Sequence, residues 1–387
     1  MSIWLLNLRH LAALAAIVRL GSISAAARAV ALTQPAVTQA LAKLEAALGL
    51  RLFDRRPDGM VATPAARLLA PRIEAALVHI GSRRVTMAQV RALIAVADGG
   101  SYAGASALSG LAPPSLHRAV GDLGLALGRS LVERRGRGLM LTSAGRRTAR
   151  GFRLARAELL AGLGEVAGLA GPAVGRIAIG AMPLSRARLL PQAVAAFHRL
   201  YPEVAIAIAE GSHVELIEPL RDGEIDMMIG ALRHPSPGPD VVQVALMHDR
   251  PVVLARAGHP LAETAPDLAA IASYPWIVSA PGTPLRGQWE AMFDAAGMAR
   301  PPVPIESGSV MIIRGLLRGG DFLTLLSPDQ VASELVAGWL VQIAEMPPGL
   351  RRTIGVTTRA DWTPTAPQRA FLALLKAAAE TSIRQNL

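Results

Sequence analysis

The sequence predicts an α+β protein of several domains, with helical modules in its first two-fifths and alternating strands and helices in the remainder. Three observations support this fold class: an internal repeat of helical segments, a change to strand-and-helix alternation near Arg176, and a basic charge confined to the repeated part. The length of 387 residues is enough for two to three domains, each with its own core.

The composition excludes several classes of protein. The chain has no cysteine, which rules out disulfides, thiolate zinc sites, iron–sulfur clusters and a cysteine nucleophile. An apolar fraction of 51% is too high for a disordered chain. The long uncharged stretch at residues 268–285 contains three prolines and does not predict a membrane span. The first ten residues have no secretory pattern, so we expect a cytoplasmic protein without a membrane partner.

The net charge of +11 is unevenly distributed along the chain. Residues 1–156 carry 22 basic against 7 acidic side chains, or +15, whereas residues 157–387 carry 18 against 22, or −4. This division indicates a part that binds a polyanion, joined to a part with another role. Nearly all the basic residues are arginine, so a bias in genome composition is an alternative source of the excess.

Residues 8–67 align with residues 87–146 at a constant offset of 79, without a gap. Shared alanine and leucine mean little in so alanine-rich a chain, but shared glycine, proline, hydroxyl residues and paired arginines at fixed positions are informative. The matched pairs include Gly21/Gly100, Ser22/Ser101, Pro35/Pro114, Gly49/Gly128, Arg55/Arg134, Arg56/Arg135, Gly59/Gly138 and Thr63/Thr142. We therefore predict a duplicated module, with domains at 1–83 and 84–171.

In the first copy, an apolar stripe at helical spacing predicts a helix that ends at Gly21. Either Ser22 or Ser24 is expected to cap a second, short helix over 25–30. After a turn at 31–33, a third helix is predicted over 35–48, with Thr33 or Gln34 as its N-cap and Gly49 at its end. The order helix, short helix, tight turn, helix is that of a helix-turn-helix, whose last helix enters the major groove of DNA.

The predicted third helix has one apolar face and one polar face. The polar face, which we expect to meet base edges, carries Gln34, Ala36, Thr38, Gln39 and Lys43. The segment that follows predicts a two-stranded wing, with its turn at Asp58-Gly59 and a further helix opening at Thr63-Pro64. Arg55 and Arg56 lie at the wing edge, where guanidinium groups suit phosphate contacts.

The second copy repeats this layout with different exposed residues. Its recognition helix is predicted over 114–127 and presents Ser115, His117, Arg118 and Asp122, while its wing carries Arg134, Arg135 and Arg137. We expect the two modules to read different bases. Any one of these helices could be an ordinary amphipathic helix, but two copies with wings and arginine pairs make that alternative weak.

The first copy also matches a known signature. Ser22, Gln34, Pro35, Ala36, Val37, Glu45, Gly49, Phe53 and Arg55 occupy positions of the pattern SxxxAAxxLxxxQPAVSxxIxxLExxLGxxLFxR, with Thr38 in place of its second serine. This pattern closely resembles the winged helix-turn-helix of LysR-type transcriptional regulators. In the second copy, Pro113, Gly124 and Val132 replace the Gln, Glu and Phe, so base reading and backbone gripping both stay open for it. The tandem arrangement resembles a small subgroup named for regulators of galactose-binding proteins.

The layout and the resemblance together assign double-stranded DNA as a partner. The DNA-contacting residues are expected to be Ser22, Gln34, Pro35, Ala36, Thr38, Gln39, Lys43, Arg55 and Arg56 in the first copy, and Ser115, His117, Arg118, Arg134, Arg135 and Arg137 in the second. A helix predicted over 144–169 corresponds to the linker helix that, in LysR-like proteins, pairs with a second subunit. The resemblance thus implies a homodimer or homotetramer, with RNA polymerase as a further partner.

From Arg176 onward, short apolar strands alternate with helices. Strands are predicted at 176–180, 204–210, 225–230, 251–255, 276–278, 303–306, 322–326, 340–343 and 353–358, and helices at 189–200, 214–221, 284–296, 310–318, 329–337 and 366–383. The resemblance implies a bilobed, periplasmic-binding-protein-like effector domain over 172–387. Its lobe I would cover 174–243 and 346–387 and its lobe II 247–343, with crossings near 242–247 and 343–346.

Ligands of α/β sheets bind at the C-terminal ends of strands and at helix N-termini. The loops at those places carry Met182, Leu184, Ser185, Ser212, His213, Thr283, Arg286, Ser307 and Ser309, our candidates for binding a small-molecule effector. Each hydroxyl taken alone is more often a helix cap. Met182 and Leu184 favour a large or partly apolar effector over a small anionic aromatic acid. We expect no cofactor and no metal.

An enzyme is the main competing class. The chain has no GxSxG, P-loop, HExxH or strand-associated GxGxxG pattern, and its histidines show no catalytic or metal-binding spacing. A solute receptor would need export and would not need two basic helix-turn-helix modules. The sequence therefore favours an effector-controlled, sequence-specific transcriptional regulator that is not an enzyme, and the remaining alternative is an architectural DNA-binding protein without an effector response.

Overall fold

The computed structural model describes residues 2–56, 59–135, 138–347 and 350–385. The chain forms two compact units, one of Met1–Gly175 with Asp222–Glu224 and one of Arg176–Arg221 with Ile225–Leu387. Within these described ranges, no helix is long and apolar enough to cross a membrane.

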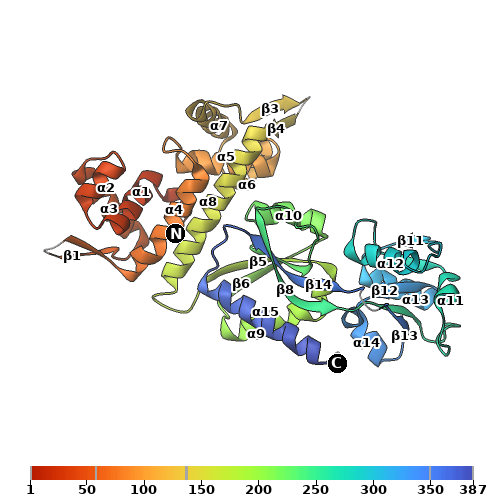
Figure 1. Cartoon of the computed structure of the whole chain (residues 1–387). Helices are drawn as coiled ribbons and strands as arrows, with labels where there is room; N and C mark the ends of the chain where they lie inside the picture. Colours follow the sequence, from red (N-terminus) through yellow and green to blue (C-terminus); the bar gives the residue numbers. More distant parts are fainter. Residues whose placement is uncertain (1, 57–58, 136–137, 348–349, 386–387) are drawn as a thin grey trace. The chain divides into compact units, whose positions relative to one another are not determined.

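The first winged module has the predicted order of elements (Figure 1). They are η1 Ile3–Leu5, α1 Leu8–Leu20, α2 Ile23–Ala29, α3 Gln34–Leu48, β1 Phe53–Arg56, β2 Gly59–Ala62 and α4 Pro64–Ile80. Gly21 and Gly49 end α1 and α3 at φ values of +71° and +68°, a left-handed backbone that glycine adopts without strain. Ser22 and Thr33, rather than Ser24 and Gln34, are the N-caps of α2 and α3.

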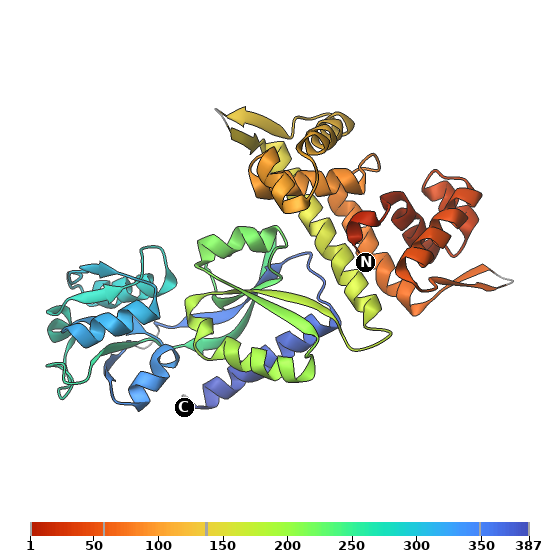
Figure 2. The same ribbon diagram turned by 180° about the vertical axis from the view of Figure 1, so that it is seen from behind.

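The second module repeats these elements at the offset of 79 residues (Figure 2). They are α5 Met87–Gly99, α6 Tyr102–Ser109, α7 Pro113–Leu127, β3 Val132–Arg135, β4 Gly138–Leu141 and α8 Ser143–Ala167. Its recognition helix α7 begins after Ala112, which offers no side-chain cap where the first copy has Thr33. The turns of both wings, including the predicted turn residue Asp58, lie outside the described residues.

The two modules share one apolar core. A single cluster of buried side chains runs from Ile3 in η1 to Val166 in α8 and includes α1, α4 and α5. The ranges 1–83 and 84–171 therefore fold into one compact unit.

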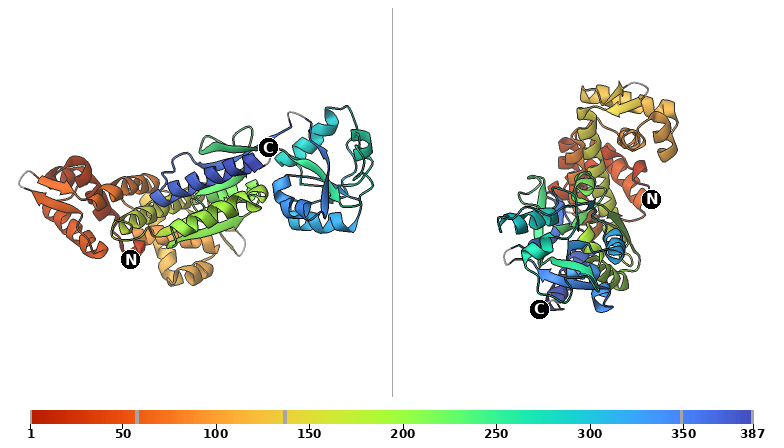
Figure 3. Two further views of the ribbon diagram at one scale, coloured as in Figure 1. Left: turned by 90° about the horizontal axis from the view of Figure 1, so that it is seen from below. Right: turned by 90° about the vertical axis from the view of Figure 1, so that its right-hand side faces the viewer.

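The second unit consists of two α/β lobes. Lobe I has a five-stranded sheet in the order β6-β5-β7-β14-β8. Its elements are β5 Gly175–Ala181, η2 Pro183–Arg186, α9 Leu189–Leu200, β6 Val204–Glu210, α10 His213–Arg221, β7 Met227–Ala231, β8 Val241–Asp249, β14 Arg352–Arg359 and α15 Ala366–Gln385. Helices α9 and α15 lie side by side in this lobe, with Phe197 and Phe371 in edge-to-face contact (Figure 3).

Lobe II has a second five-stranded sheet, in the order β11-β10-β12-β9-β13. Its elements are β9 Val252–Arg256, α11 Leu268–Ala272, β10 Trp276–Val278, α12 Pro284–Asp294, β11 Ile305–Glu306, α13 Val310–Gly319, β12 Leu323–Leu326, η3 Pro328–Val331, α14 Ala332–Val336 and β13 Leu340–Glu345. Trp276, Trp289 and Phe293 are fully buried at its centre. The predicted helix over 329–337 is η3 followed by α14.

Both predicted crossings between the lobes overlap strands. Most of the crossing near 343–346 belongs to β13, which pairs with β9 of lobe II as far as Glu345. Residues 242–247 do not connect the lobes but belong to β8, which pairs antiparallel with β14 of lobe I, so the chain crosses only after Asp249. Strand β8 forms one edge of the sheet, and much of it is exposed. Its short, interrupted apolar pattern therefore resembled a connection.

Candidate nucleic-acid interface and effector site

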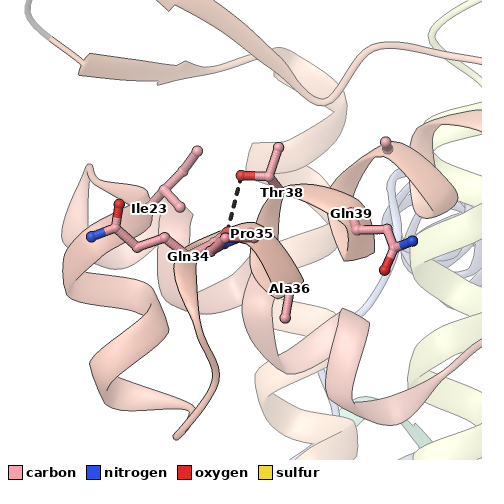
Figure 4. Close-up of a pocket in the computed structure, with 7 residues that line it drawn as sticks. Ile23, Gln34, Pro35, Ala36, Thr38 and Gln39 are labelled. Carbon is pink, nitrogen blue, oxygen red and sulfur yellow. Dashed lines mark hydrogen bonds between the residues drawn. The ribbon is translucent and has the colours of Figure 1, made fainter.

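The recognition helix α3 presents an open polar face. Gln34, Gln39 and Lys43 are exposed, and Figure 4 shows the two glutamine side chains at opposite ends of a concave surface. Thr38 lies between them, and its Oγ1 donates a hydrogen bond of 3.1 Å to the Gln34 carbonyl oxygen. Ile23 of α2 also lines this surface, a position that we did not predict. The predicted base-reading residues thus lie together on one accessible face.

Two other signature residues of the first module, Ser22 and Glu45, make hydrogen bonds within the module. The Ser22 hydroxyl accepts a 3.1 Å hydrogen bond from the Ala25 N–H and so caps α2. The signature residue Glu45 accepts a 2.7 Å hydrogen bond from the Leu52 N–H and so ties α3 to the base of the wing. The second module has Gly124 at the place of Glu45 and lacks this tie.

The second recognition helix, α7, presents a different chemistry at the equivalent place. Ser115, His117, Arg118 and Asp122 are all exposed. The His117 ring lies 5.2 Å from the ring of Tyr102, the position that corresponds to Ile23. Burial raises the pKa of Tyr102, and the positive charge of Arg134 opposes that rise. The repeat offset would have identified Tyr102 from Ile23, but Ile23 itself carried no signal.

The predicted arginines of the wings are described only in part. Arg55 and Arg56 lie in β1, and Arg134 and Arg135 in β3, each strand paired antiparallel with its partner. Arg134 is exposed. The side chains of Arg55, Arg56 and Arg135 are not described, and Arg137 lies outside the described residues.

In lobe I, the effector candidates of the first loop are buried. Met182 and Leu184 are 5% and 7% exposed, and Ser185 is fully buried with its hydroxyl donating to the Met182 carbonyl oxygen at 2.8 Å. The backbone of Gly230 lies so close to Met182 that a Cβ there would be 2.5 Å from the Met182 Cβ. These side chains therefore belong to the interior of lobe I, which weakens the prediction of an apolar effector that rested on Met182 and Leu184.

His213 is the candidate in lobe I with free hydrogen-bonding capacity. Ser212 caps α10, since its hydroxyl accepts from the Glu215 N–H at 3.4 Å. The buried Nε2 of His213 has no hydrogen-bond partner among the described residues. Burial, together with the nearby charges of Arg233 and Arg221, lowers the pKa of His213, which favours a neutral ring.

In lobe II, the candidate hydroxyls cap helices and the candidate arginine is paired. Thr283 and Ser309 accept hydrogen bonds from the first turns of α12 and α13, and Ser307 accepts one from the Ser309 N–H. Arg286 donates to Glu290 at 2.9 Å and to Glu306 at 3.1 Å, and it lies over the Trp289 ring. An effector carboxylate would therefore have to compete with two carboxylates already on Arg286.

The lobes also meet at a contact that we did not predict. Short helices η2 and η3 lie against each other, and Arg188 beside η2 forms an ion pair of 3.3 Å with Asp329 in η3. In the described part of the chain, no cluster of three or more His, Asp or Glu side chains could hold a metal ion.

Two family descriptions match the chain. The bacterial regulatory helix-turn-helix protein of the lysR family matches twice, at residues 8–67 and 87–146, which are the bounds of the repeat found in the sequence. The LysR substrate binding domain matches residues 170–380.

Similar proteins cover the chain to different extents. The HTH-type transcriptional regulator GalR of Pseudomonas putida is 30% identical over 96% of this chain and 96% of its own length. ArgP from Mycobacterium tuberculosis has a similar structure, with a TM-score of 0.59 and 19% identity over 75% of this chain and 96% of ArgP. LysG from Corynebacterium glutamicum with bound effector Arg gives a TM-score of 0.54 at 20% identity, over 76% and 97%. The two solved structures thus lack a counterpart for about a quarter of this chain, and their likeness concerns the fold.

Proposed function

Since the chain belongs to the LysR family of bacterial transcriptional regulators, we propose that both of its winged modules contact DNA and that an effector bound between the lobes of its second unit controls this binding. The chain is a DNA-binding transcriptional regulator with an effector-binding domain, not an enzyme. The observation that carries the proposal is that α3 and α7 expose polar faces while the apolar stripe of each helix is buried in a common core. Such faces are what a helix needs to read base edges in the major groove.

For the first module, we assign base reading to Gln34 and Gln39 and phosphate binding to Arg55 and Arg56. A glutamine amide can donate to and accept from an adenine edge, whereas a wing guanidinium neutralises phosphate whatever the sequence. In the second module, Arg118 is the best candidate for base reading, since guanidinium groups pair with guanine. Thr38 and Lys43 belong to the first face, and Ser115 and His117 belong to the second.

Fluorescence anisotropy at several salt concentrations tests this division. Arg55→Ala with Arg56→Ala should weaken binding to all duplexes alike and reduce the slope of log K against log salt by up to about one per lost phosphate contact. Gln39→Ala should change sequence preference and leave that slope unchanged. If the full chain does not distinguish its own promoter region from random DNA, or if both variants relax specificity alike, this assignment fails.

For the second unit, we propose an effector site at the facing strand ends of the two lobes. The bound effector in LysG supports a small-molecule site in this fold. The unpartnered Nε2 of His213 supports a polar contact from lobe I, and the loops with Thr283, Arg286, Ser307 and Ser309 would supply the contacts from lobe II. Because Arg286 is already paired, a neutral polar or zwitterionic effector suits the site better than a simple carboxylate.

Thermal denaturation against a panel of amino acids, sugars and organic acids tests this site. A true effector stabilises the native state by RT ln(1+[L]/Kd). His213→Ala should reduce that stabilisation, whereas His198→Ala, an exposed histidine of the same lobe, should not. Absence of any response across the panel would favour constitutive DNA binding, and equal losses in both variants would remove His213 from the site.

The remaining partners follow from this role. We propose that the protein acts in the cytoplasm, where its DNA target lies, that it assembles into a homodimer or homotetramer, and that it affects transcription through RNA polymerase. Sedimentation of the full chain with and without DNA would measure the assembly.

A further inference from the structure

Two helices that correspond in the repeat pack against each other within one chain. Helix α4 follows the first wing and helix α8 follows the second, and residues 64–80 align with residues 143–159. In Figures 1 and 2, α4 and α8 lie along each other between the two modules, a contact that is also the most extensive between any two helices of the unit. The linker helix α8, for which a second subunit was expected, thus has a partner in its own chain.

The two helices bury the same face. Six positions of α4 are buried together with their counterparts in α8. These pairs are Ala66/Gly145, Leu69/Thr148, Ala70/Ala149, Ile73/Phe152, Ala76/Ala155 and Ile80/Leu159. Equivalent surfaces are therefore covered in both copies, as expected when two copies of one module pair through a shared element.

The contacts between the helices are reciprocal. Arg72 of α4 forms a 3.0 Å ion pair with Glu158 of α8. The counterpart of Arg72 in the second copy is Gly151, and the counterpart of Glu158 in the first copy is His79. Gly151 lies against His79, where a Cβ on the glycine would be 2.5 Å from the His79 carbonyl oxygen. The position of Arg72 and Gly151 in each copy thus contacts the position of His79 and Glu158 in the other copy. Such reciprocal contacts are typical of a two-fold arrangement.

The side chains at these positions are compatible only with the pairing of one α4 with one α8. Arg72 forms ion pairs with Glu158 and Glu165, each at 3.0 Å, and only 6% of its side chain is exposed. Gly162 of α8 also packs closely against the aliphatic part of the Arg72 side chain. A Cβ added at Gly162 would lie 3.1 Å from the Cβ and Cγ atoms of Arg72. Two α4 helices would bring Arg72 against His79, and two α8 helices would bring Glu158 against Gly151, so neither equal pair could form these bonds.

A further contact fixes the modules to each other. The N-terminal η1 of the first module packs against α5 of the second, with Ile3 buried in the common core. The Arg91 guanidinium of α5 lies 6.0 Å from the Trp4 ring. The recognition helices are therefore carried by one body with a single core.

We infer that one chain is a complete pair of DNA-reading modules, and that it binds a single duplex site made of two unlike half-sites in inverted orientation. This inference rests on the proposed DNA contacts of α3 and α7. The two-fold arrangement supplies the inversion, and the intrachain pairing supplies the stoichiometry of one chain per complete site. An oligomer of the chain then has several complete pairs of modules, each able to bind one duplex site.

The chemistry of the two faces makes the half-sites unlike. The first face has Gln34, Thr38, Gln39 and Lys43 where the second has Pro113, His117, Arg118 and Asp122. Glutamine prefers adenine, arginine prefers guanine and aspartate accepts from cytosine. We therefore expect the half-site of the second module to be the richer in G·C pairs.

Selection of bound duplexes from a random library with the full-length chain tests the inference. The expected consensus is not a palindrome, and titration at concentrations far above the Kd should saturate at one chain per duplex. Gln39→Ala should alter preference in one half-site only and Arg118→Ala in the other. Inserting about five base pairs between the half-sites should weaken binding by about tenfold or more, because half a helical turn moves one half-site to the opposite side of the duplex.

Several outcomes would overturn the inference. They are a palindromic consensus, both variants acting on the same bases, or saturation at two chains per duplex. Failure to select any sequence would instead count against the proposed DNA-reading faces themselves.

Charge reversal tests whether the pairing occurs within one chain. Arg72→Glu alone, or Glu158→Arg with Glu165→Arg, should impair folding and specific binding, and all three changes in one chain should restore both. A mixture of the two impaired chains should stay inactive, since the complementary helices are then on different molecules. If the mixture recovers specific binding, α4 pairs with α8 of another chain and the inference is wrong.

Discussion

Arg72 shows how strongly one residue can depend on its partners. Its guanidinium is buried, and both carboxylates that neutralise it come from α8, 86 and 93 residues further along the chain. Burial lowers the pKa of Arg72, but its hydrogen bonds and charge interactions with Glu165 and Glu158 outweigh that effect and raise it overall. Charges removed from water are tolerated only with such partners.

Arg72→Met should therefore lower the free energy of unfolding by about 3–5 kcal/mol, because two buried carboxylates lose their counter-ion. Arg19→Met is the matched control, since Arg19 and Glu74 form an exposed pair at 3.9 Å that should contribute less than about 1 kcal/mol. Denaturant titration of both variants measures the difference. Similar small losses in both would mean that the buried cluster is well hydrated.

Asp226 provides a pH dependence with a defined sign. Burial raises its pKa above the usual 3.8, although the Ala178 N–H donates to it at 2.8 Å and Arg359 lies nearby. A raised pKa in the native state means that the native state binds the proton more tightly than the unfolded state. The stabilising effect of the protonated group is present below pH 3.8 and is lost as the pH rises through the raised value.

Asp226→Asn, which keeps an acceptor and removes the charge, should abolish this part of the pH dependence. The stability of the variant relative to the natural protein should increase as the pH rises from the acid range toward neutrality. Glu380→Gln, at an exposed position of α15, is the control. The prediction would be wrong if the stability difference between Asp226→Asn and the natural protein stayed constant with pH. Burial would then not raise the pKa of Asp226.

Single residues were the hardest level to predict from sequence. Helical periodicity correctly predicted that the polar side chains of α3 and α7 are exposed. Ser22, Thr283 and Ser309 cap helices, and the sequence could not indicate this, since a hydroxyl before a helix has the same sequence signal as a cap or as a ligand contact. Nothing local in the sequence indicates that Glu290 and Glu306 neutralise Arg286, because the second of these is 20 residues away.

At the level of the element, helix α8 contains glycines at positions where neighbouring segments approach its backbone closely. A Cβ at Gly145 would overlap the carbonyl oxygen of Leu131 at the base of the second wing. Gly121 in α7, by contrast, is exposed, and a Cβ there would meet no heavy atom within 4 Å. The same substitution should therefore have opposite effects in the two helices.

Gly145→Ala should destabilise the first unit by about 1–3 kcal/mol through overpacking. Gly121→Ala should stabilise it by about 0.5–1 kcal/mol, because alanine loses less backbone entropy in a helix. Thermal and denaturant unfolding of the two variants would measure this. A stabilising Gly145→Ala would show that the wing base can move away.

Elements with strong local signals were predicted from the sequence. Helices α1, α2, α3 and α7 and both wings follow from capping residues, proline and glycine positions and apolar spacing. Strand β8 and helix α11 were not predicted: β8 is a partly exposed edge strand, and α11 has only five residues. The α4–α8 pairing was also missed, since amphipathic periodicity gives the buried face of a helix but not the element that covers it.

At the level of the whole molecule, the two units have separate cores. The first has the cluster that joins both winged modules, and the second has its own clusters in the lobes. The sequence indicated this division through its charge, +15 in residues 1–156 and −4 in the remainder.

Calorimetry should therefore resolve two unfolding transitions. A duplex that contains the selected site should raise the transition of the first unit, because ligands stabilise only the unit that binds them. A small molecule found in the effector screen should raise the other transition. A single transition that both ligands raise equally would show that the units unfold together.

The reciprocal but unequal pairing of α4 with α8 also affects how such a protein can evolve. In a dimer of identical subunits, one substitution in the recognition helix changes the base preference for both halves of the operator at once. Both halves of the DNA site must then change together with the protein. Here a change at Arg118 leaves the face with Gln39 as it was. With the two unlike half-sites that we infer, each half of a target could drift separately, and the duplication would have turned one inherited specificity into two that mutate independently.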